Sequence, residues 1–428
     1  MKPPLAAGLR AISLSLLIGL PALGAEERLS LAGMWRFSRD DAKVGLSEKW
    51  YMAELKPTGD GPSEISLPGT TDEAKAGVPN PKPPSLDGLY RPNVYTGPAW
   101  YQREVNIPDT WKSKQVTLFL ERNHWVTRVW LDGQDLGTQD SLICPQVYDL
   151  GTHAGPGNHL LTICVDNTLK LDLGEFVSIN YEGTQTNWNG IIGAIELRAA
   201  DPVAIDDVQV YPDVDRKLIK VLARVGNRTG SPVGGTMQFS VADETGAAAG
   251  APAVAPFSAA NGESVVSLEI PVGDHPKLWD EFSPNLYLLK CSLSSQSPEC
   301  HSEREISFGM RKLASRGTQF TMNGRTLMLR GTLECAIFPL TGYPPTDIAS
   351  WRRIFQIAKS YGLNDKLGNV FETKVGNGRL LVCTLNLGSG KTPEAAQFLK
   401  SLYAYAASDA FAPAQELDGS VLNKILLP

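Results

Sequence analysis

The sequence predicts a mainly β fold, with two antiparallel β-sandwiches in succession and a short α/β segment after them. Short runs of alternating apolar and polar residues recur from about residue 29 to residue 312, and turn residues separate them. Hardly any amphipathic helix interrupts these runs. The chain holds 40 glycines and 30 prolines among 428 residues, a content that suits many turns between strands.

Residues 1–24 have the pattern of a signal peptide. Lys2 and Arg10 flank its start, residues 11–20 form an apolar run, and Ala22 and Gly24 supply the small residues of a cleavage site. The run is too short to span a bilayer, so we expect removal and export to the periplasm or extracellular space, with no membrane partner afterwards. An uncleaved anchor is the alternative. The mild net charge of −6 and the lack of a Lys/Arg block argue against nucleic acid as a partner.

The cysteines and histidines predict neither a metal site nor a cofactor. The six cysteines show no Cys-x-x-Cys spacing, and the five histidines form no pair at helical ligand spacing. Cys291 and Cys300 are either bridged between neighbouring strands, which an oxidising compartment would permit, or buried as free thiols.

The first domain is expected over residues 29–200. Its strand patterns cover residues 115–121, 126–131 and 159–165, with the turn Asp132-Gly133 after the second. Short strands at near-regular spacing are typical of a β-sandwich or jelly roll. Trp35, Trp100 and Tyr101 lie inside strand-like apolar stretches and are expected in the core.

Five motifs of this region occur in a familiar order: residues 31–37 (LAGMWRF), 65–69 (ISLPG), 97–105 (GPAWYQREV), 165–167 (VDN) and 187–193 (NWNGIIG). Together they resemble the N-terminal sugar-binding domain of glycoside hydrolase family 2, the β-galactosidase, β-glucuronidase and β-mannosidase group. The resemblance implies a jelly roll. It also implies that loops of this domain reach a sugar bound at the mouth of a catalytic barrel.

Amides and an aromatic ring supply the chemistry that a sugar site requires. Buried polar groups that pair with sugar hydroxyls are selective, because leaving one unpaired is costly. The resemblance carries sugar binding to Asn93, Gln185, Asn187, Trp188, Asn189 and Arg91. The alternative is that these side chains only support loops, as Asn and Gln often do in turns. Asp166-Asn167 is interpreted as a turn device.

The second domain is expected over residues 201–312 as a small sandwich of immunoglobulin type. Strand patterns cover residues 203–211, 218–225, 236–241, 264–270 and 288–293, whereas the Ala/Pro-rich residues 247–260 are predicted as an exposed loop. Residues 278–287 (LWDEFSPNLY) and 307–311 (SFGMR) resemble the second domain of the same family, which implies a spacing and supporting role.

Residues 316–364 are predicted to begin a (β/α)₈ barrel. Residues 320–331 fit a hairpin with the turn Asn323-Gly324, and residues 326–331 are expected to be a buried strand. A helix over residues 346–361 follows, with Thr346 as its N-cap and an apolar face formed by Ile348, Trp351, Phe355 and Ala358. One strand–helix unit cannot bury its own faces, so this segment is expected to be poorly ordered or packed on the sandwiches.

Residues 365–428 do not continue the barrel, which needs eight such units and typically ~250 residues. They predict a strand at 369–375, a turn at 376–378, a strand at 379–387 and a helix at 393–408. This α/β tail resembles the closing part of a glutamine-amidotransferase-like domain. Cys383 lies within a strand, so it is not interpreted as a nucleophile.

The catalytic carboxylates of the family cannot be identified. Retaining glycosidases use two carboxyl groups about 5–5.5 Å apart, and the family's acid/base Glu follows an Asn. No Asn-Glu dipeptide occurs here, and the glutamates after Thr326 are Glu334, Glu372, Glu394 and Glu416. We therefore predict an exported carbohydrate-binding protein, derived from a family 2 retaining β-glycosidase, that binds a β-glycoside without catalysis as the chain stands. The alternatives are an active β-glycosidase, if barrel residues are supplied, and a structural or adhesion module. The sugar and the oligomeric state stay open.

Overall fold

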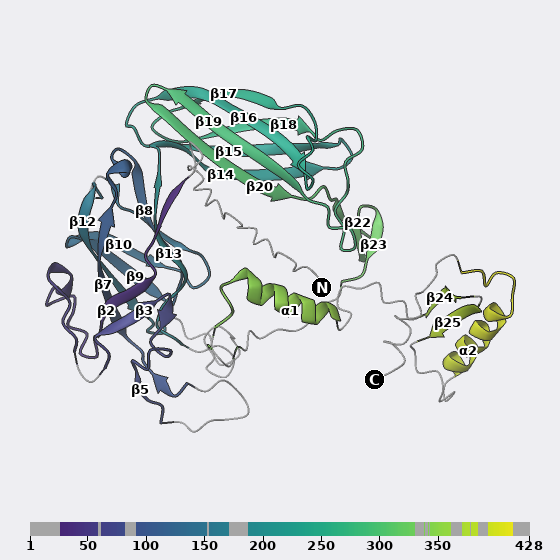
Figure 1. Ribbon diagram of the computed structural model, residues 1–428, viewed down its shortest axis with the longest axis horizontal. Helices are drawn as coiled ribbons and strands as arrows, with labels where there is room; N and C mark the ends of the chain where they lie inside the picture. Colours follow the sequence, from purple (N-terminus) through teal and green to yellow (C-terminus); the bar gives the residue numbers. More distant parts are fainter. Residues whose placement is uncertain are drawn as a thin grey trace, which may run out of the picture. The chain divides into compact units, whose positions relative to one another are not determined.

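Two antiparallel sheets packed face to face form the first sandwich of the computed structural model (Figure 1). The structure describes residues 26–58, 61–81, 91–151, 154–170, 187–329, 338, 341, 343–360, 370–376, 378–383 and 393–413. The expected signal peptide, Gln185 and Glu334 lie outside these residues. The chain divides into two compact units, residues 1–353 and 354–428.

The smaller sheet of the first sandwich runs in the order β1 (Glu27–Ser30), β13 (Gly190–Ala200), β8 (Gln115–Asn123) and β11 (Gln146–Asp149), and β4 (Gly69–Thr70) also pairs with β13. The larger sheet runs in the order β10 (Gln134–Asp140), β9 (Val126–Leu131), β12 (Gly157–Asp166), β7 (Pro98–Ile107), β2 (Gly33–Arg39) and β3 (Glu64–Leu67). A separate ladder joins β5 (Val78–Pro79) to β6 (Asn93–Val94), and two 3₁₀ turns cover Trp50–Met52 and Asp109–Trp111.

Alternating burial explains why these segments become strands. Val116, Leu118 and Leu120 of β8 are fully buried in the core between the sheets, as their period of two predicts. The turn Asp132-Gly133 has φ values of 52° and 80°, the conformation of a tight hairpin turn, and is confirmed. Trp35 and Tyr101 lie in this core, also as predicted.

Trp100 is buried as expected, but it lies in a separate cluster. It packs on Trp130, with ring centroids 5.2 Å apart, together with Leu55 and Cys164. This second small core is closed by the partly buried Trp50 and Tyr51. The first sandwich therefore has apolar packing outside the space between its sheets.

The second sandwich pairs a sheet of three strands with a sheet of four (Figure 1). The first sheet contains β14 (Val203–Asp213), β15 (Leu218–Asn227) and β18 (Gly262–Pro271). The second contains β17 (Ala253–Ala259), β16 (Val233–Asp243), β19 (Tyr287–Gln296) and β20 (Glu299–Phe308). Its core holds Met237, Phe239 and Leu289, all inward-facing on the central strands.

One prediction for this sandwich is wrong. Residues 247–260 are not simply a loop, because β17 forms the edge of the four-stranded sheet and buries Phe257 and Ala259. Pro256 lies within this strand opposite Thr236. Proline is tolerated in edge strands, where its missing N–H does not break a central ladder. The Ala/Pro composition therefore concealed a true strand.

Cys291 and Cys300 are buried free thiols. The two strands that carry them do pair, but Cys291 lies opposite Arg304 and Cys300 lies opposite Ser295. This register separates the two thiols along the ladder. It decides between the two alternatives in favour of packing, with burial raising the pKa of Cys291 to about 12.

Charged side chains connect the two sandwiches. Arg304 of the second sandwich lies 3.5 Å from Glu26, which also contacts Arg28 at 3.0 Å. The main-chain N–H of Ile205 donates to the hydroxyl of Ser302 inside the second sandwich, next to this crossing point. The ion pairs are partly buried, so salt screens them less than fully exposed pairs.

A three-stranded hairpin unit follows, with strands β21 (Leu313–Arg316), β22 (Gln319–Met322) and β23 (Arg325–Leu327). The predicted turn at Asn323-Gly324 is confirmed, with φ values of 53° and 81°. Of the buried strand predicted over residues 326–331, Thr326 and Leu327 are a strand, at the end of β23, whereas the predicted burial is wrong for the residues that the structure describes. Met328 is 76% exposed and Leu329 is 70% exposed, so neither fills a core here.

The next helix, α1 (Ile348–Ser360), begins two residues later than predicted. Asp347, not Thr346, caps it, because its carboxylate accepts the main-chain N–H of Ser350 at 2.8 Å. Hydrogen bonds from the hydroxyl and then from the main-chain N–H of Ser350 lower the pKa of Asp347. Of the expected apolar face, Trp351 and Ala358 are half-buried whereas Ile348 and Phe355 are exposed. Within the described part of the chain, no helix is long and apolar enough to cross a bilayer.

The second unit contains a hairpin and a helix. Strands β24 (Val370–Val375) and β25 (Gly378–Cys383) pair antiparallel, and α2 (Pro393–Ala406) follows. Its tyrosine Tyr405 donates a hydrogen bond to Glu372 at 2.6 Å and packs edge-on against Phe411. The predicted order of strand, strand and helix is confirmed for the residues that the structure describes.

Candidate functional site

A cavity of about 480 Å³ lies at one end of the first sandwich. Its aromatic lining comes from three separate stretches of sequence, at the end of β8, before β13 and in the segment that precedes α1. The residues that line it are Glu121, Arg122, His124, Leu142, Ile143, Pro145, Trp188, Ile192, Tyr343 and Pro344. We call this the β8–β13 pocket.

Trp188 and His124 form one wall of the β8–β13 pocket. Their ring centroids are 5.0 Å apart, and Nδ1 of His124 lies 2.7 Å from the main-chain oxygen of Trp188. Burial lowers the pKa of His124 to about 4. The imidazole is therefore neutral near pH 7 and donates its Nδ1 proton to this carbonyl, which holds the indole in place.

Asn189 holds together the loops behind this wall. Its side-chain oxygen accepts the hydroxyl proton of Tyr101 at 2.9 Å, and its Nδ2 donates to the carbonyls of Gly97 and Val165 at 3.0 and 2.9 Å. The residue is fully buried. Its amide is thus engaged by protein groups on both sides, which is a supporting role in this structure.

Asn167 and Arg91 complete this support. Nδ2 of Asn167 donates to the carbonyls of Tyr95 and Asn187, and its oxygen accepts the N–H of Gly97. Arg91 is buried, pairs with Asp72 at 3.2 Å, and donates to the Asn187 carbonyl at 3.1 Å. The loop that carries Asn187 is therefore fixed by two side chains from distant loops. Asp166 accepts from Thr168 in an Asx turn, so the interpretation of Asp166-Asn167 as a structural device is confirmed.

Gly190 is required where β13 meets β4. A Cβ atom there would lie 2.3 Å from the Gly69 carbonyl oxygen, and the φ of Gly190 is +148°, a value that L side chains rarely adopt. The glycine of the sequence motif NWNG therefore allows the close approach that brings Trp188 beside β8.

Tyr343 forms the adjoining wall, although 270 positions separate it from its hydrogen-bond partner. Its hydroxyl donates to Glu73 at 3.0 Å, and its ring lies 5.9 Å from that of Trp188. Glu73 accepts the N–H and hydroxyl of Thr70 as well. Burial and the neighbouring carboxylate raise the pKa of Tyr343 well above its usual value, so the phenol stays protonated.

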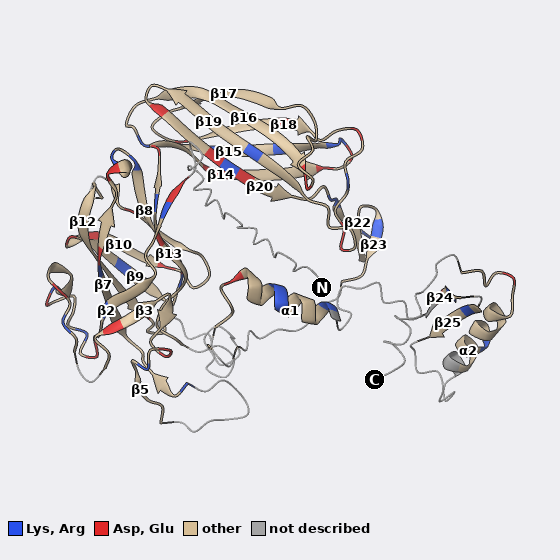
Figure 2. Cartoon of the chain, in the orientation of Figure 1, with Lys and Arg blue, Asp and Glu red and all other residues tan. Residues whose placement is uncertain are grey.

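The charged side chains of the pocket are one carboxylate and one guanidinium among the residues that can be described. Glu121 accepts the N–H of Ala194 at 2.7 Å, and Arg122 lies 3.8 Å from Glu121. Figure 2 shows acidic and basic positions interspersed over the surrounding strands. Within the described ranges, no three His, Cys, Asp or Glu side chains are placed to hold a metal ion.

The structure brings together only part of the predicted sugar-binding set. Trp188 lines the pocket, whereas Asn189 and Arg91 hold its loops in place, and Asn187 is held through its main-chain carbonyl. Asn93 is half-buried on the β5–β6 ladder and is not part of this lining. Gln185 lies outside the described residues. Sugar contact by these residues stays a prediction.

Sequence reasoning missed His124 and Tyr343. His124 carried no pairing signal, and Tyr343 becomes a neighbour of Trp188 only through the fold. The one local signal was an aromatic residue in a Gly- and Pro-rich stretch, Gly342-Tyr343-Pro344-Pro345.

Comparison with known protein families decides the family. Residues 29–197 match the model described as glycosyl hydrolases family 2, sugar binding domain, and residues 203–311 match glycosyl hydrolases family 2. The two sandwiches belong to glycosyl hydrolase family 2. Residues 345–427 match a separate family, described as a domain of unknown function (DUF8487). The matched range includes residues 364 and 365.

Family 2 relatives include β-glucuronidases and β-galactosidases. The chain is 22% identical to a β-glucuronidase of Paenibacillus borealis over 70% of its own length and 48% of the relative. It is 25% identical to β-galactosidase 2 of Enterobacter cloacae over 80% of its own length and 34% of the relative. The chain thus spans half or less of these curated relatives.

Solved family 2 structures share the fold. β-Glucuronidase 2 of Bacteroides uniformis, bound covalently to cyclophellitol-6-carboxylate aziridine, matches with a TM-score of 0.62 and 18% identity, over 79% of this chain and 39% of that one. A β-glucuronidase of Ruminococcus gnavus matches with a TM-score of 0.58 and 18% identity, over 79% and 54% of the two chains.

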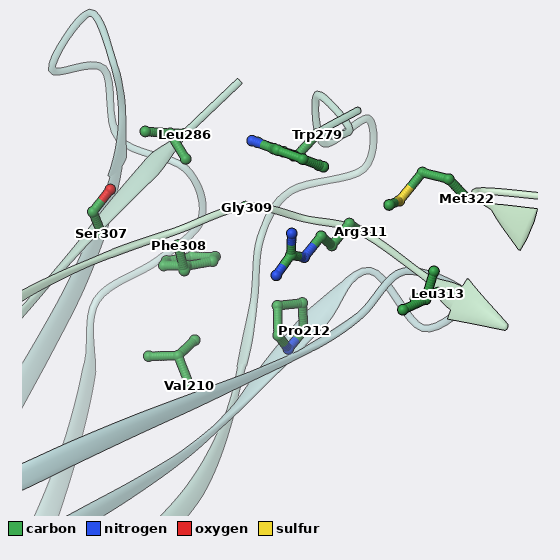
Figure 3. Close-up of a pocket in the computed structure, with 10 residues that line it drawn as sticks. All are labelled: Val210, Pro212, Trp279, Leu286, Ser307, Phe308, Gly309, Arg311, Leu313 and Met322. Atoms are coloured by element: carbon green, nitrogen blue, oxygen red, sulfur yellow. The ribbon is translucent and has the colours of Figure 1, made fainter. Parts of the chain in front are cut away.

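The signature residues of the second family 2 domain surround another hollow, of about 570 Å³ (Figure 3). The guanidinium of Arg311 lies 4.8 Å from the Trp279 ring and points into the space between Trp279 and Pro212. The main-chain N–H of Trp279 donates to the main-chain carbonyl of Met310 at 2.8 Å. A Cβ atom at Gly309 would lie 2.8 Å from the Trp279 side chain. The two signatures therefore pack on each other, which explains them without a ligand.

Proposed function

We propose that this chain is an exported carbohydrate-binding protein of glycosyl hydrolase family 2 that binds β-glycosides in the β8–β13 pocket and does not hydrolyse them by itself. The observation that carries this proposal is the aromatic corner of Trp188 and Tyr343, set beside polar groups in a cavity of about 480 Å³. Such a cavity has the volume of an ordinary small-molecule site.

The chemistry of the lining supports a sugar. Aromatic faces bury the C–H surface of a pyranose, while charged and polar groups at the edge bond its hydroxyls. Glu121 and Arg122 are at that edge and are only partly buried. The names of the relatives, β-glucuronidase and β-galactosidase, favour a β-glycoside as the ligand.

The carboxylate content of the described pocket lining supports binding without turnover. Retaining hydrolysis needs two carboxyl groups about 5–5.5 Å apart. In the described lining Glu121 is the one carboxylate, and the Ala194 N–H occupies one of its oxygens. The chain also contains no Asn-Glu dipeptide.

Saturation-transfer NMR on the purified full chain tests the proposal. The ligands are methyl β-D-galactoside, methyl β-D-glucuronide and methyl β-D-mannoside, each at millimolar concentration. We expect transfer to at least one sugar, and we expect it to fall at least severalfold in Trp188→Ala but not in Tyr211→Ala, an exposed tyrosine on the second sandwich. Absence of transfer to all three sugars would contradict binding.

Hydrolysis is tested with the same protein and the matching 4-nitrophenyl β-glycosides. We expect no release of nitrophenol above the uncatalysed rate. Turnover that survives repurification would instead favour the second candidate, an active β-glycosidase. The names of the family 2 relatives favour that candidate, provided that further residues supply the two carboxyl groups.

Export is tested by expressing the full-length gene and determining the N-terminus of the secreted or periplasmic product. We expect the mature chain to begin at Ala25, after the small residues of the cleavage site. A product that retains Met1 and sediments with membranes would contradict export of a cleaved protein.

A further inference from the structure

We propose that Tyr343 is a positioning residue of the β8–β13 pocket: Tyr343 and Pro344 close the pocket from outside the sugar-binding domain, and the Trp188–Tyr343 corner sets how tightly a pyranose is held. This inference rests on the proposed function for its ligand. It adds a residue that lies beyond both family 2 domain matches, at residues 29–197 and 203–311.

The first step is that the two rings form one surface. The centroids of Trp188 and Tyr343 are 5.9 Å apart and the ring planes meet at 51°. Rings in this arrangement touch each other, so a sugar cannot slide between them. They offer instead an apolar corner, on which one face and one edge of a pyranose can rest at once.

The second step is that Tyr343 is held at both ends of its side chain. Its hydroxyl donates to Glu73, which Thr70 fixes through its main-chain N–H and its hydroxyl. Its main-chain carbonyl accepts the Thr341 hydroxyl at 2.7 Å. A ring that is already ordered costs little further entropy when a ligand binds, which favours affinity.

The third step is that Trp351 of α1 holds the chain that follows Tyr343. The indole N–H of Trp351 donates to the Pro345 carbonyl at 2.8 Å, and the ring packs on Phe338 with centroids 6.2 Å apart. Pro344 lines the pocket next to Tyr343. Pro344 and Pro345 restrict the backbone between Tyr343 and α1.

The consequence is that the complete sugar site requires residues that precede the second sandwich in the sequence and residues that follow it. Loops of the first sandwich supply Trp188 and His124, while Tyr343 and Pro344 supply the adjoining wall. A protein with both family 2 domains but without these two residues would have an open pocket. We expect such openness to weaken binding, because the ligand would keep more of its surface in water.

The experiment compares four full-length variants with the unchanged protein by NMR titration of whichever methyl β-glycoside binds. Tyr343→Ala removes the ring and the hydroxyl, and we expect about tenfold weaker binding. Tyr343→Phe keeps the ring but loses the bond to Glu73, and we expect an intermediate loss of about threefold. Glu73→Gln keeps an acceptor for the phenol, and we expect a smaller effect than for Tyr343→Phe. Tyr211→Ala, the matched control, should bind normally.

Hydrogen exchange gives a readout that needs no ligand. We expect the amides of residues 70–76 and 187–193 to exchange faster in Tyr343→Ala than in the unchanged protein, and at the unchanged rate in Tyr211→Ala. Equal exchange and equal affinity for Tyr343→Ala would overturn the inference. If the unchanged protein bound no sugar, the proposed function and the ligand part of this inference would fall, while the exchange data would still decide whether Tyr343 closes the pocket.

Discussion

The two sandwiches differ most in what they bury. The first buries many polar side chains near the β8–β13 pocket, among them Arg91, Asn167 and Asn189, whereas the described buried polar residues of the second are Asn227, Ser295 and Ser302. Buried polar groups are costly unless fully paired, so a domain that only spaces and supports can omit them. The first sandwich therefore uses paired polar side chains to fix the loops around the β8–β13 pocket.

The largest effect that we expect is a loss of stability from a substitution in the apolar core of the second sandwich. Phe239→Ala in the second sandwich should lower the free energy of unfolding by about 3–5 kcal/mol, because a fully buried ring leaves a cavity. Calorimetry should show the transition of this sandwich at a lower temperature.

Tryptophan fluorescence can follow the first sandwich separately. Seven of the nine tryptophans lie there: Trp35, Trp50, Trp100, Trp111, Trp125, Trp130 and Trp188. The fluorescence transition of Phe239→Ala should move less than the calorimetric one. Equal shifts would show that the sandwiches unfold as one unit, and the comparison between them would then fail.

The next effect concerns the buried polar side chains of the first sandwich. Asn189→Ala should cost about 2–3 kcal/mol, because the carbonyls of Gly97 and Val165 and the hydroxyl of Tyr101 lose their partner inside the protein. It should also weaken sugar binding, since Trp188 is the adjacent residue.

Asn227→Ala is the matched control for this change. Asn227 is a buried amide of the second sandwich that donates to the carbonyls of Ser231 and Ala259. We expect a similar loss of stability in urea unfolding but unchanged sugar affinity. A loss of affinity in Asn227→Ala would contradict the division of roles between the domains.

A smaller effect should appear on acidification. The pKa of His124 is about 4 in the folded protein, below the value of about 6.5 of an unfolded histidine. As pH falls below 6.5 the unfolded state takes up a proton that the folded state refuses, so stability falls. Between pH 7 and pH 5 this group alone should cost roughly 2 kcal/mol.

Urea unfolding of the unchanged protein and of His124→Gln at both pH values isolates this contribution. Carboxylates and other histidines titrate in both proteins, so the difference between the two pH dependences reports His124. Parallel pH dependences would show that the imidazole is not buried in its neutral form.

The smallest effect concerns the contact between the sandwiches. Arg304→Ala should lower stability by about 1 kcal/mol at low salt and by less at high salt, because its ion pair with Glu26 is partly exposed. Lys290→Ala, which removes an exposed pair with Glu303, is the control and should change little. Thermal unfolding at two salt concentrations measures both.

The sequence was sufficient for most of the fold because alternation is a local signal. The alternating residues of β8 and the turns at Asp132-Gly133 and Asn323-Gly324 are set by neighbours in the chain. β17 was not predicted because proline and alanine have low strand propensity, and this segment forms a strand through its pairing with β16. Met328 and Leu329 looked buried, since apolarity alone does not reveal whether a partner surface exists.

The candidate site was predicted less well, for a physical reason. Trp188 and its glycine lie in one motif, so local sequence was enough to single them out. Tyr343 joins them only through tertiary contact across 270 positions with Glu73, which no local pattern encodes. Asn189 is predicted as a sugar ligand and is found bonded to main-chain carbonyls, because an amide serves sugar hydroxyls and carbonyls equally well.

The proline within β17 bears on how neighbouring molecules meet at high concentration. β17 is the outermost strand of its sheet, and it exposes Val254 beside an open row of main-chain groups. Such a rim can recruit a strand from a second copy and start aggregation. Proline has no N–H, so Pro256 contributes no donor to this edge strand. We expect Pro256→Val to increase light scattering of concentrated, folded protein, and unchanged scattering would contradict this. Pro256, which made β17 hard to predict from the sequence, would then also limit association between molecules.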